Sequence, residues 1–227
     1  MVLCINLKDG FERDLSGVNL SVTSAVAIYQ NIAIVPVVNS EGQPGAPGDV
    51  RAFDVRSGKE VWRFHTVPKP YEAGSETWLT DGWKNRTGAN PWSGFTVDAG
   101  RGIVFCPIGS AASDFYGGDR PGNNLFANST VALDARTGKR IWHFQTVHHD
   151  VWDYDLPSQP VLYEMKNAQG TKTPVLIQTT KTGHIFVLDR RTGQPVTEVQ
   201  ERPVPTSPAA EGELLTAPSP IGDGADV

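Results

Sequence analysis

Two stretches of the sequence share one pattern and decide the fold: Ala52-Phe-Asp-Val-Arg-Ser-Gly-Lys-Glu-Val-Trp-Arg-Phe-His-Thr-Val67 and Ala132-Leu-Asp-Ala-Arg-Thr-Gly-Lys-Arg-Ile-Trp-His-Phe-Gln-Thr-Val147. A shorter copy without the tryptophan runs Val187-Leu-Asp-Arg-Arg-Thr-Gly-Gln-Pro-Val196, and Ile5-Asn-Leu-Lys-Asp-Gly10 resembles the start of a fourth. Repetition of one unit along a chain is typical of repeat architectures. The sequence therefore predicts about four copies of a single structural unit.

Each copy has the pattern of a β-hairpin. Apolar residues alternate, an Asp-x-x-Thr/Ser-Gly turn follows, and alternation resumes after a glycine that can adopt a positive φ. Further strand candidates lie between the copies, at 25–28, 32–38, 102–108, 175–180 and 184–188. About four strands per repeat is typical of a β-propeller blade, so the prediction is an all-β propeller in which Trp62 and Trp142 pack between neighbouring sheets.

Composition narrows the class of protein. The 227 residues are 39% hydrophobic and 20% charged, with a formal net charge of −5 and no run of Lys or Arg, so a nucleic-acid partner is not expected. The longest apolar stretch, 24–38, is interrupted by polar residues and a proline, and the N-terminus lacks the pattern of a secretory signal. Cys4 and Cys106 could be paired, free or packed, and we expect two buried thiols.

Long loops separate the repeats. The interval between the first two tryptophan-containing copies holds more residues than four short strands need. Segment 71–95 is rich in Trp, Asn, Gly and acidic residues, and segment 110–129 is rich in Gly, Asp and Asn. Neither segment has the pattern of regular structure. Because binding and catalytic groups concentrate on loops held by a rigid scaffold, we expect the functional site there.

The repeats and three further segments resemble those of a known protein family. The repeats, together with Trp142-His-Phe-Gln-Thr-Val-His-His-Asp-Val-Trp-Asp-Tyr-Asp-Leu-Pro157 and the blocks 107–118 and 180–191, resemble the quinoprotein dehydrogenases that use pyrroloquinoline quinone (PQQ), in particular the membrane-bound glucose and polyol dehydrogenases. The resemblance implies a partial eight-bladed propeller with tryptophan-docking repeats. On this interpretation 1–201 is about four PQQ-binding blades and 202–227 is a loop that leads to missing blades. Such a piece, taken alone, is expected neither to retain PQQ nor to turn over.

The resemblance also assigns catalytic roles. PQQ accepts a hydride from a carbinol carbon while a base removes the hydroxyl proton, and the position of that base falls on Asp153. A bound Ca²⁺ or Mg²⁺ is expected beside it. Lys181, in a predicted hairpin turn, falls where the family places a lysine near the quinone oxygens, where its charge would stabilise the reduced cofactor. The alternative for Lys181 is an ordinary solvated turn.

Two further residues are implied to hold the cofactor. Trp92 corresponds to the tryptophan on which the flat PQQ ring stacks, although a loop tryptophan that fills a blade edge is the alternative. His148, His149, Asp150 and Asp155 crowd one segment and, without the resemblance, would suggest a transition-metal site. Adjacent histidines on a strand point to opposite faces, so we expect one, His149, to line the pocket and the other to be structural.

The predicted metal ligands depart from the alcohol-oxidising branch of the family. Ser110 occupies the place of an asparagine, and Glu41 is the candidate for the upstream carboxylate, so the expected ligands are Asp153, Ser110 and Glu41. The vicinal cysteine pair of that branch is absent from this sequence, which favours the sugar and polyol branch.

The predicted function is therefore PQQ-dependent oxidation of a sugar, polyol or alcohol in the periplasm. By resemblance, electrons pass to ubiquinone or a cytochrome, and inner-membrane association would come from regions not present here. Two alternatives remain open. One is a non-catalytic propeller that acts as a scaffold for assembly or binding, and the other is a lectin-like propeller that stacks sugars on exposed Trp78 and Trp83.

Overall fold

The computed structural model describes residues 21–166, 169–202 and 219–222, and in these ranges the regular structure is almost entirely β. The exception is a single 3₁₀ turn, η3 (Ser75–Thr77). The first sheet contains β1 (Ala27–Tyr29), β2 (Ile32–Val35), β3 (Val50–Asp54) and β4 (Glu60–Phe64). The second contains β5 (Thr96–Asp98), β6 (Ile103–Pro107), β7 (Ser129–Asp134) and β8 (Arg140–Gln145). The third contains β9 (Val161–Lys166), β10 (Lys172–Thr179) and β11 (Ile185–Asp189), and β12 (Val199–Arg202) pairs with β13 (Ser219–Gly222).

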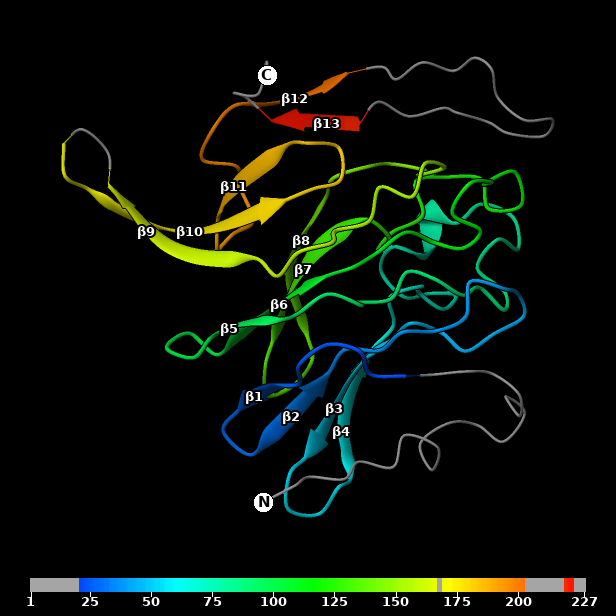
Figure 1. The fold of residues 1–227 in the computed structure, drawn as a ribbon, viewed down its shortest axis with the longest axis horizontal. Coiled ribbons are helices and arrows are strands. Elements are labelled where there is room, and N and C mark those ends of the chain that lie inside the picture. Colours follow the sequence, from blue (N-terminus) through cyan, green and yellow to red (C-terminus); the bar gives the residue numbers. More distant parts are fainter. Residues whose placement is uncertain (1–20, 167–168, 203–218, 223–227) are drawn as a thin grey trace.

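Each sheet is an antiparallel meander in which strands that follow one another in sequence are neighbours in space. The first strands of successive sheets also touch, because β1 contacts β5 and β5 contacts β9. The sheets therefore fan out from a common inner edge, as Figure 1 shows. This is the arrangement of propeller blades around an axis, and it confirms the predicted all-β propeller.

The repeat hairpins form as predicted. In the second blade the Asp134 carboxylate accepts hydrogen bonds from the backbone N–H groups of Arg136 and Thr137, at 3.0 and 2.9 Å, and this fixes the turn between β7 and β8. Asp54 makes the same contacts at the corresponding turn of the first blade. Gly58, Gly138 and Gly193 close the three turns with φ of 69°, 69° and 74°, a backbone region that other residues rarely adopt.

The two repeat tryptophans join neighbouring blades. Trp62 lies on β4 of the first blade and donates a hydrogen bond from Nε1 to the carbonyl oxygen of Ala135 in the second, at 3.2 Å. Trp142 on β8 makes the equivalent bond to the carbonyl oxygen of Arg190 in the third blade, at 3.1 Å. Both indoles are buried and lie over the turn glycine of the next repeat, Gly138 or Gly193. The prediction that these tryptophans pack between sheets is confirmed.

The structure bears on the predicted C-terminal loop and on the two cysteines. Arg202, predicted to begin a connecting loop, ends strand β12, and Ser219–Gly222 pairs with that strand. The stretch expected to be a loop thus contains a β-ribbon, while the domain division itself remains a prediction. Cys106 is a free thiol buried in the core, and burial raises its pKa. Cys4 and the expected partial repeat at 5–10 lie outside the described residues.

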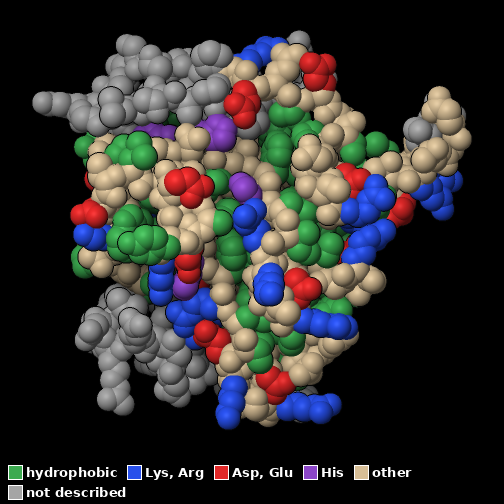
Figure 2. Space-filling view, turned by 180° about the vertical axis from the view of Figure 1, so that it is seen from behind, with side chains coloured by type: hydrophobic (Ala, Val, Ile, Leu, Met, Phe, Trp, Pro, Cys, Tyr) green, Lys and Arg blue, Asp and Glu red, His purple; other side chains and the backbone are tan. Residues whose placement is uncertain are grey.

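The surface carries both signs of charge. On the face shown in Figure 2, Lys and Arg side chains alternate with Asp and Glu side chains and with apolar groups, and no broad basic area is visible on that face. Within the described ranges, no helix has the length and apolar character needed to cross a bilayer.

The docking of Trp62 predicts a specific sensitivity at Gly138. A Cβ atom at Gly138 would come within 2.6 Å of the Trp62 ring, whereas a Cβ at Gly58, which has the same φ of 69°, would meet nothing within 4 Å. We expect Gly58→Ala to lower the free energy of unfolding only by the cost of a left-handed backbone at a non-glycine residue, about 1–2 kcal/mol. Gly138→Ala should lower it by about 1–3 kcal/mol more, because the new methyl group overpacks against the Trp62 ring. Unfolding of both variants in denaturant measures the difference, and equal losses would show that the indole does not constrain the turn.

Candidate functional site

The candidate site is formed by loops at one end of the blades. The loops between β2 and β3, β4 and β5, β6 and β7, β8 and β9, and β10 and β11 all emerge at this end, because each begins or ends on the same side of an antiparallel meander. Four of these loops are long, at 36–49, 65–95, 108–128 and 146–160, while the opposite end has tight turns. The blades therefore bring segments that are far apart in the sequence to one pocket.

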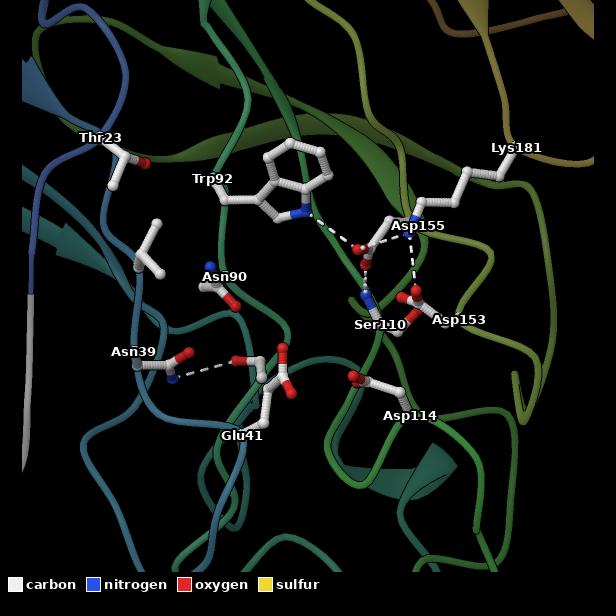
Figure 3. A pocket seen from close by; sticks show the side chains of 12 residues that line it. Thr23, Asn39, Glu41, Asn90, Trp92, Ser110, Asp114, Asp153, Asp155 and Lys181 are labelled. Atoms are coloured by element: carbon white, nitrogen blue, oxygen red, sulfur yellow. Dashed lines mark hydrogen bonds and ion pairs between the residues drawn. The ribbon is translucent and has the colours of Figure 1, made fainter.

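This pocket has a volume of about 420 Å³, within the range of small-molecule sites. Figure 3 shows that its polar side chains converge from all five loops. The lining residues are Thr23, Val38, Asn39, Glu41, Gly88, Asn90, Trp92, Ser110, Asp114, Asp153, Asp155 and Lys181. Five of the six residues predicted from sequence as site residues are among them: Glu41, Trp92, Ser110, Asp153 and Lys181.

Asp153 and Lys181 form an ion pair inside the pocket. Lys181 Nζ lies 2.9 Å from Asp153 Oδ2 and 3.2 Å from Asp155 Oδ2. Asp153 has a left-handed backbone with φ of 58°, and the Lys181 turn connects β10 to β11. The carboxylate and the ammonium thus meet although 28 residues separate them in sequence. The pairing holds the Lys181 ammonium at the pocket.

The electrostatic environment affects both members of the pair. Partial burial, assisted by the negative charge of Asp155, raises the pKa of Asp153, although the hydrogen bond from Lys181 acts in the opposite direction. Burial alone would lower the pKa of Lys181, but the hydrogen bonds and charges of the two aspartates outweigh it and raise that pKa. Lys181 therefore stays charged near neutral pH, and Asp153 is a stronger base than an exposed aspartate.

Asp155 connects Trp92 to this ion pair. Its Oδ2 atom accepts a hydrogen bond from Trp92 Nε1 at 3.0 Å, and its Oδ1 atom accepts one from the backbone N–H of Ser110. Lys181 Nζ lies 5.9 Å from the centre of the Trp92 ring, in cation–π range. The indole, the ammonium and the loop after β6 are thus fixed by one carboxylate.

A second group of carboxylates faces the same space. Figure 3 shows the Glu41 and Asp114 carboxylates directed into the pocket from the loops after β2 and β6. Burial, together with the negative charges of Glu41, Asp153, Asp155 and Asp150, raises the pKa of Asp114 to about 6. The pocket therefore carries more negative charge than Lys181 neutralises.

Asn39 contributes a buried oxygen without a partner. Its Nδ2 atom donates hydrogen bonds to the carbonyl oxygens of Ala46 and Gly88, at 2.8 and 3.3 Å, which leaves Oδ1 on the other side of the amide. Oδ1 is buried and accepts no hydrogen bond. Because an unpaired buried acceptor is costly, a donor or a cation bound at this wall of the pocket would stabilise the Asn39 oxygen.

The structure does not bring His149 to the pocket. Its side chain is buried, Nδ1 lies 2.9 Å from the carbonyl oxygen of Gly122, and it is not among the lining residues. His148 is likewise absent from the lining and contacts Gln145. His149 therefore lies outside the lining of this pocket, and its positive φ (48°) departs from the strand alternation on which the expectation was based.

The exposed stacking platforms of the lectin alternative are also corrected. Trp78 is buried, and its Nε1 atom donates to the carbonyl oxygen of Leu125. Trp83 is half-buried and packs against the hydrophobic core of the first two blades. Tertiary packing of the long loop between β4 and β5 thus buries the Trp78 indole and leaves the Trp83 ring only partly exposed.

The described residues do not by themselves form a metal centre. Across 21–166, 169–202 and 219–222, no three His, Cys, Asp or Glu side chains come close enough together to hold an ion. Of the expected ligands, Asp153 is engaged by Lys181, and the Ser110 hydroxyl donates to Asp150 at 2.5 Å. An ion at this place would therefore need oxygen donors besides these side chains.

Sequence reasoning missed four lining residues that the geometry makes important: Asn39, Asn90, Asp114 and Asp155. In the sequence, Asp155 is conspicuous only as one of several possible transition-metal ligands in its segment. Nothing in the block 107–118 distinguishes Asp114 from its neighbours. No periodicity or spacing marks these residues, because only the convergence of loops from different blades brings them together.

Comparison with known proteins places this geometry in a family. The model of the PQQ glucose/ethanol/alcohol dehydrogenase β-propeller domain matches residues 4–225. Quinoprotein glucose dehydrogenase A of Acinetobacter calcoaceticus is 40% identical over 78% of this chain and 22% of its own length. The glycerol dehydrogenase large subunit of Gluconobacter oxydans is 35% identical over 97% of this chain and 30% of its own length.

A solved structure agrees with the sequence comparisons. The quinohemoprotein alcohol dehydrogenase from Comamonas testosteroni superposes with a TM-score of 0.73 at 29% identity, over 93% of this chain and 33% of that one. The chain thus spans less than a third of the length of these three relatives. By its repeats, its fold and the match along almost its whole length, the chain belongs to the PQQ glucose/ethanol/alcohol dehydrogenase β-propeller family.

Proposed function

We propose that this chain supplies the PQQ-side catalytic groups of a dehydrogenase that oxidises a sugar, polyol or alcohol. The observation that carries the proposal is the pairing of Asp153 with Lys181 at 2.9 Å, beside the Trp92 ring, in a pocket where loops of three blades meet. A propeller that served only as a scaffold would have no need to hold a carboxylate and an ammonium in a concave site. Packing by Trp62 and Trp142 would suffice for it.

The pocket suits a flat, oxygen-rich cofactor. Trp92 offers an aromatic ring, Lys181 a cation and Asn39 an unpaired oxygen, all on one cavity wide enough for a small molecule. We assign Trp92 to stacking and Lys181 to the quinone oxygens. His149, which the sequence suggested as a further contact, is left out of this set because it lies away from the pocket. When bound, PQQ supplies the hydride-accepting quinone.

Asp153 is the general base in this proposal. Its raised pKa makes it a better proton acceptor for a substrate hydroxyl, while the hydrogen bond from Lys181 favours its ionised form. The Lys181 ammonium, held by Asp153 and Asp155, stabilises negative charge at the site during reduction. Asp155 keeps the Trp92 indole and Lys181 in register through its two hydrogen bonds.

A divalent cation, Ca²⁺ or Mg²⁺, binds in the pocket together with the cofactor in this proposal. Carboxylate and amide oxygens are the ligands these ions prefer, and Asp153, Glu41, Asp114 and the Asn39 oxygen face the pocket. Because the described side chains are not close enough to hold an ion alone, oxygens of the cofactor would complete its shell. Ser110 is a weaker candidate, since its hydroxyl already bonds Asp150.

The remaining parts of the proposal extend to the whole protein. Similarity to glucose and glycerol dehydrogenases favours a sugar or polyol as the substrate. We propose ubiquinone or a cytochrome as the electron acceptor, a periplasmic location, and membrane association through parts of the protein outside this chain.

The charge excess at Asp114 predicts a pH effect on stability. The pKa of Asp114 is raised to about 6, so the folded state binds its proton more tightly than the unfolded state. Its ionisation therefore destabilises the fold progressively as the pH rises from about 4 to 6, and fully above that range. We expect Asp114→Asn to raise the melting temperature of the metal-free protein at pH 7 and to have no effect below pH 4. Asp81→Asn, an exposed control, should show no such pH-dependent gain.

Reconstitution tests the proposed activity. The intact protein, loaded with PQQ and either Ca²⁺ or Mg²⁺, should reduce an artificial dye with an aldose, a polyol or a simple alcohol, and activity should require PQQ. A protein that binds sugars without binding PQQ would instead support a lectin-like propeller.

The role of Asp153 predicts a separation of binding from turnover. Asp153→Asn preserves the shape of the side chain but removes the base, so we expect kcat to fall by about 10²–10⁴ while PQQ affinity, followed by quenching of tryptophan fluorescence, is largely retained. Asp81→Asn removes the same charge from an exposed ion pair with Lys84 and should leave kcat unchanged. Loss of PQQ binding in Asp153→Asn would assign Asp153 a structural or metal-binding role instead.

A further inference from the structure

Asp150 is a buried carboxylate next to the site that does not line the pocket. Its residue is 3% exposed, and it lies in the loop that carries Asp153 from β8 to β9. Arg120, also buried, donates a hydrogen bond to its backbone carbonyl at 2.5 Å. The proposed role of Asp153 as general base does not by itself explain why a second carboxylate, that of Asp150, is buried in the same loop.

The Asp150 side chain holds the backbone on both sides of Asp153. Oδ1 accepts the N–H of Trp152 at 2.9 Å, and Oδ2 accepts the N–H of Tyr154 at 2.7 Å. The residue between these two N–H groups, Asp153, has φ of 58°, in the left-handed region that residues other than glycine rarely adopt. The carboxylate of Asp150 thus stabilises the local backbone conformation that presents the proposed base.

The same carboxylate connects this loop to the neighbouring loop between β6 and β7. Asp150 Oδ2 also accepts the Ser110 hydroxyl at 2.5 Å and the Asn128 amide at 2.8 Å, both from the connection between β6 and β7. Ser110 in turn donates its backbone N–H to Asp155, which holds Trp92 and Lys181. One buried side chain therefore fixes the relative position of the base, the ammonium and the indole.

From these contacts we infer that Asp150 is a positioning residue for the reaction: it acts through the backbone of Asp153 and through Ser110 and touches neither substrate nor cofactor. This inference rests on the proposed dehydrogenase function. Asn at position 150 keeps the shape of the side chain, but its amide can accept at only one of the two oxygen positions. The amide oxygen would take the Oδ2 position, where three donors converge, and the amide NH₂ group would then face the N–H of Trp152 instead of accepting from it.

The test compares Asp150→Asn with the unsubstituted intact protein. A displacement of the base by about 1 Å can cost about 10²-fold in rate, so we expect kcat per bound PQQ to fall by about 10–100-fold. The KM for substrate and the PQQ dissociation constant should change by less than about threefold, because no pocket-lining side chain is altered. Counting only PQQ-loaded sites excludes a loss that comes from a smaller folded fraction.

Asp134→Asn is the matched control. Asp134 makes the same kind of backbone contacts, with the N–H groups of Arg136 and Thr137, but in a hairpin turn at the opposite end of the blade. We expect it to lower the melting temperature without changing kcat per bound PQQ. If Asp150→Asn does not fold, Asn128→Ala removes one donor to Asp150 Oδ2 and should lower kcat per bound PQQ in the same direction.

Three outcomes would overturn the inference: an unchanged kcat per bound PQQ in Asp150→Asn, a loss carried entirely by PQQ affinity, or, where Asp150→Asn does not fold, an unchanged value in Asn128→Ala. These results differ from failure of the proposed function, in which the unsubstituted protein itself shows no PQQ-dependent dye reduction.

Discussion

The structure depends on the contact between each repeat tryptophan and the glycine turn of the following blade. Trp62 and Trp142 reach across the blade boundary, bond a backbone carbonyl and cover Gly138 or Gly193 so closely that no side chain fits there. A sheet with two apolar faces must pack against another sheet on each face, and the tryptophan–glycine contact sets the distance and the angle between neighbouring blades. The positions of the loops at the site end depend on this packing.

Blade packing has a direct consequence for the chemistry. Because strands within a blade run antiparallel, long loops from different blades can gather at one end while tight turns occupy the other. The loop side chains then meet at close range, and their charges interact: Asp153 and Asp155 share Lys181, and burial together with its acidic neighbours raises the pKa of Asp114. A site with surplus negative charge and one shared ammonium is suited to receive a cofactor together with a cation.

Side chains that line the pocket are held in place by hydrogen bonds to two aspartates. Asp155 joins the Trp92 indole to Lys181, and Asp150 joins the Asp153 loop to the loop after β6. The buried Asp150 and the partly exposed Asp155 are both stabilised because several donors converge on each carboxylate. The side chains that line the pocket and the side chains that hold them in place therefore form one network that joins loops of neighbouring blades.

The sequence alone determined the repeat, the hairpin turns, the interblade role of Trp62 and Trp142, and the likeness to quinoprotein dehydrogenases. These features are local or periodic, and a turn glycine or an alternating strand can be recognised in one segment. Five of the six named site residues could also be placed through the resemblance. Asn39, Asp114 and the linking roles of Asp150 and Asp155 were decided only by the tertiary structure, as were the position of His149 away from the pocket and the burial of Trp78. The physical reason is that hydrogen bonding, burial and charge crowding at these residues arise between loops of different blades, and no single segment encodes those distances.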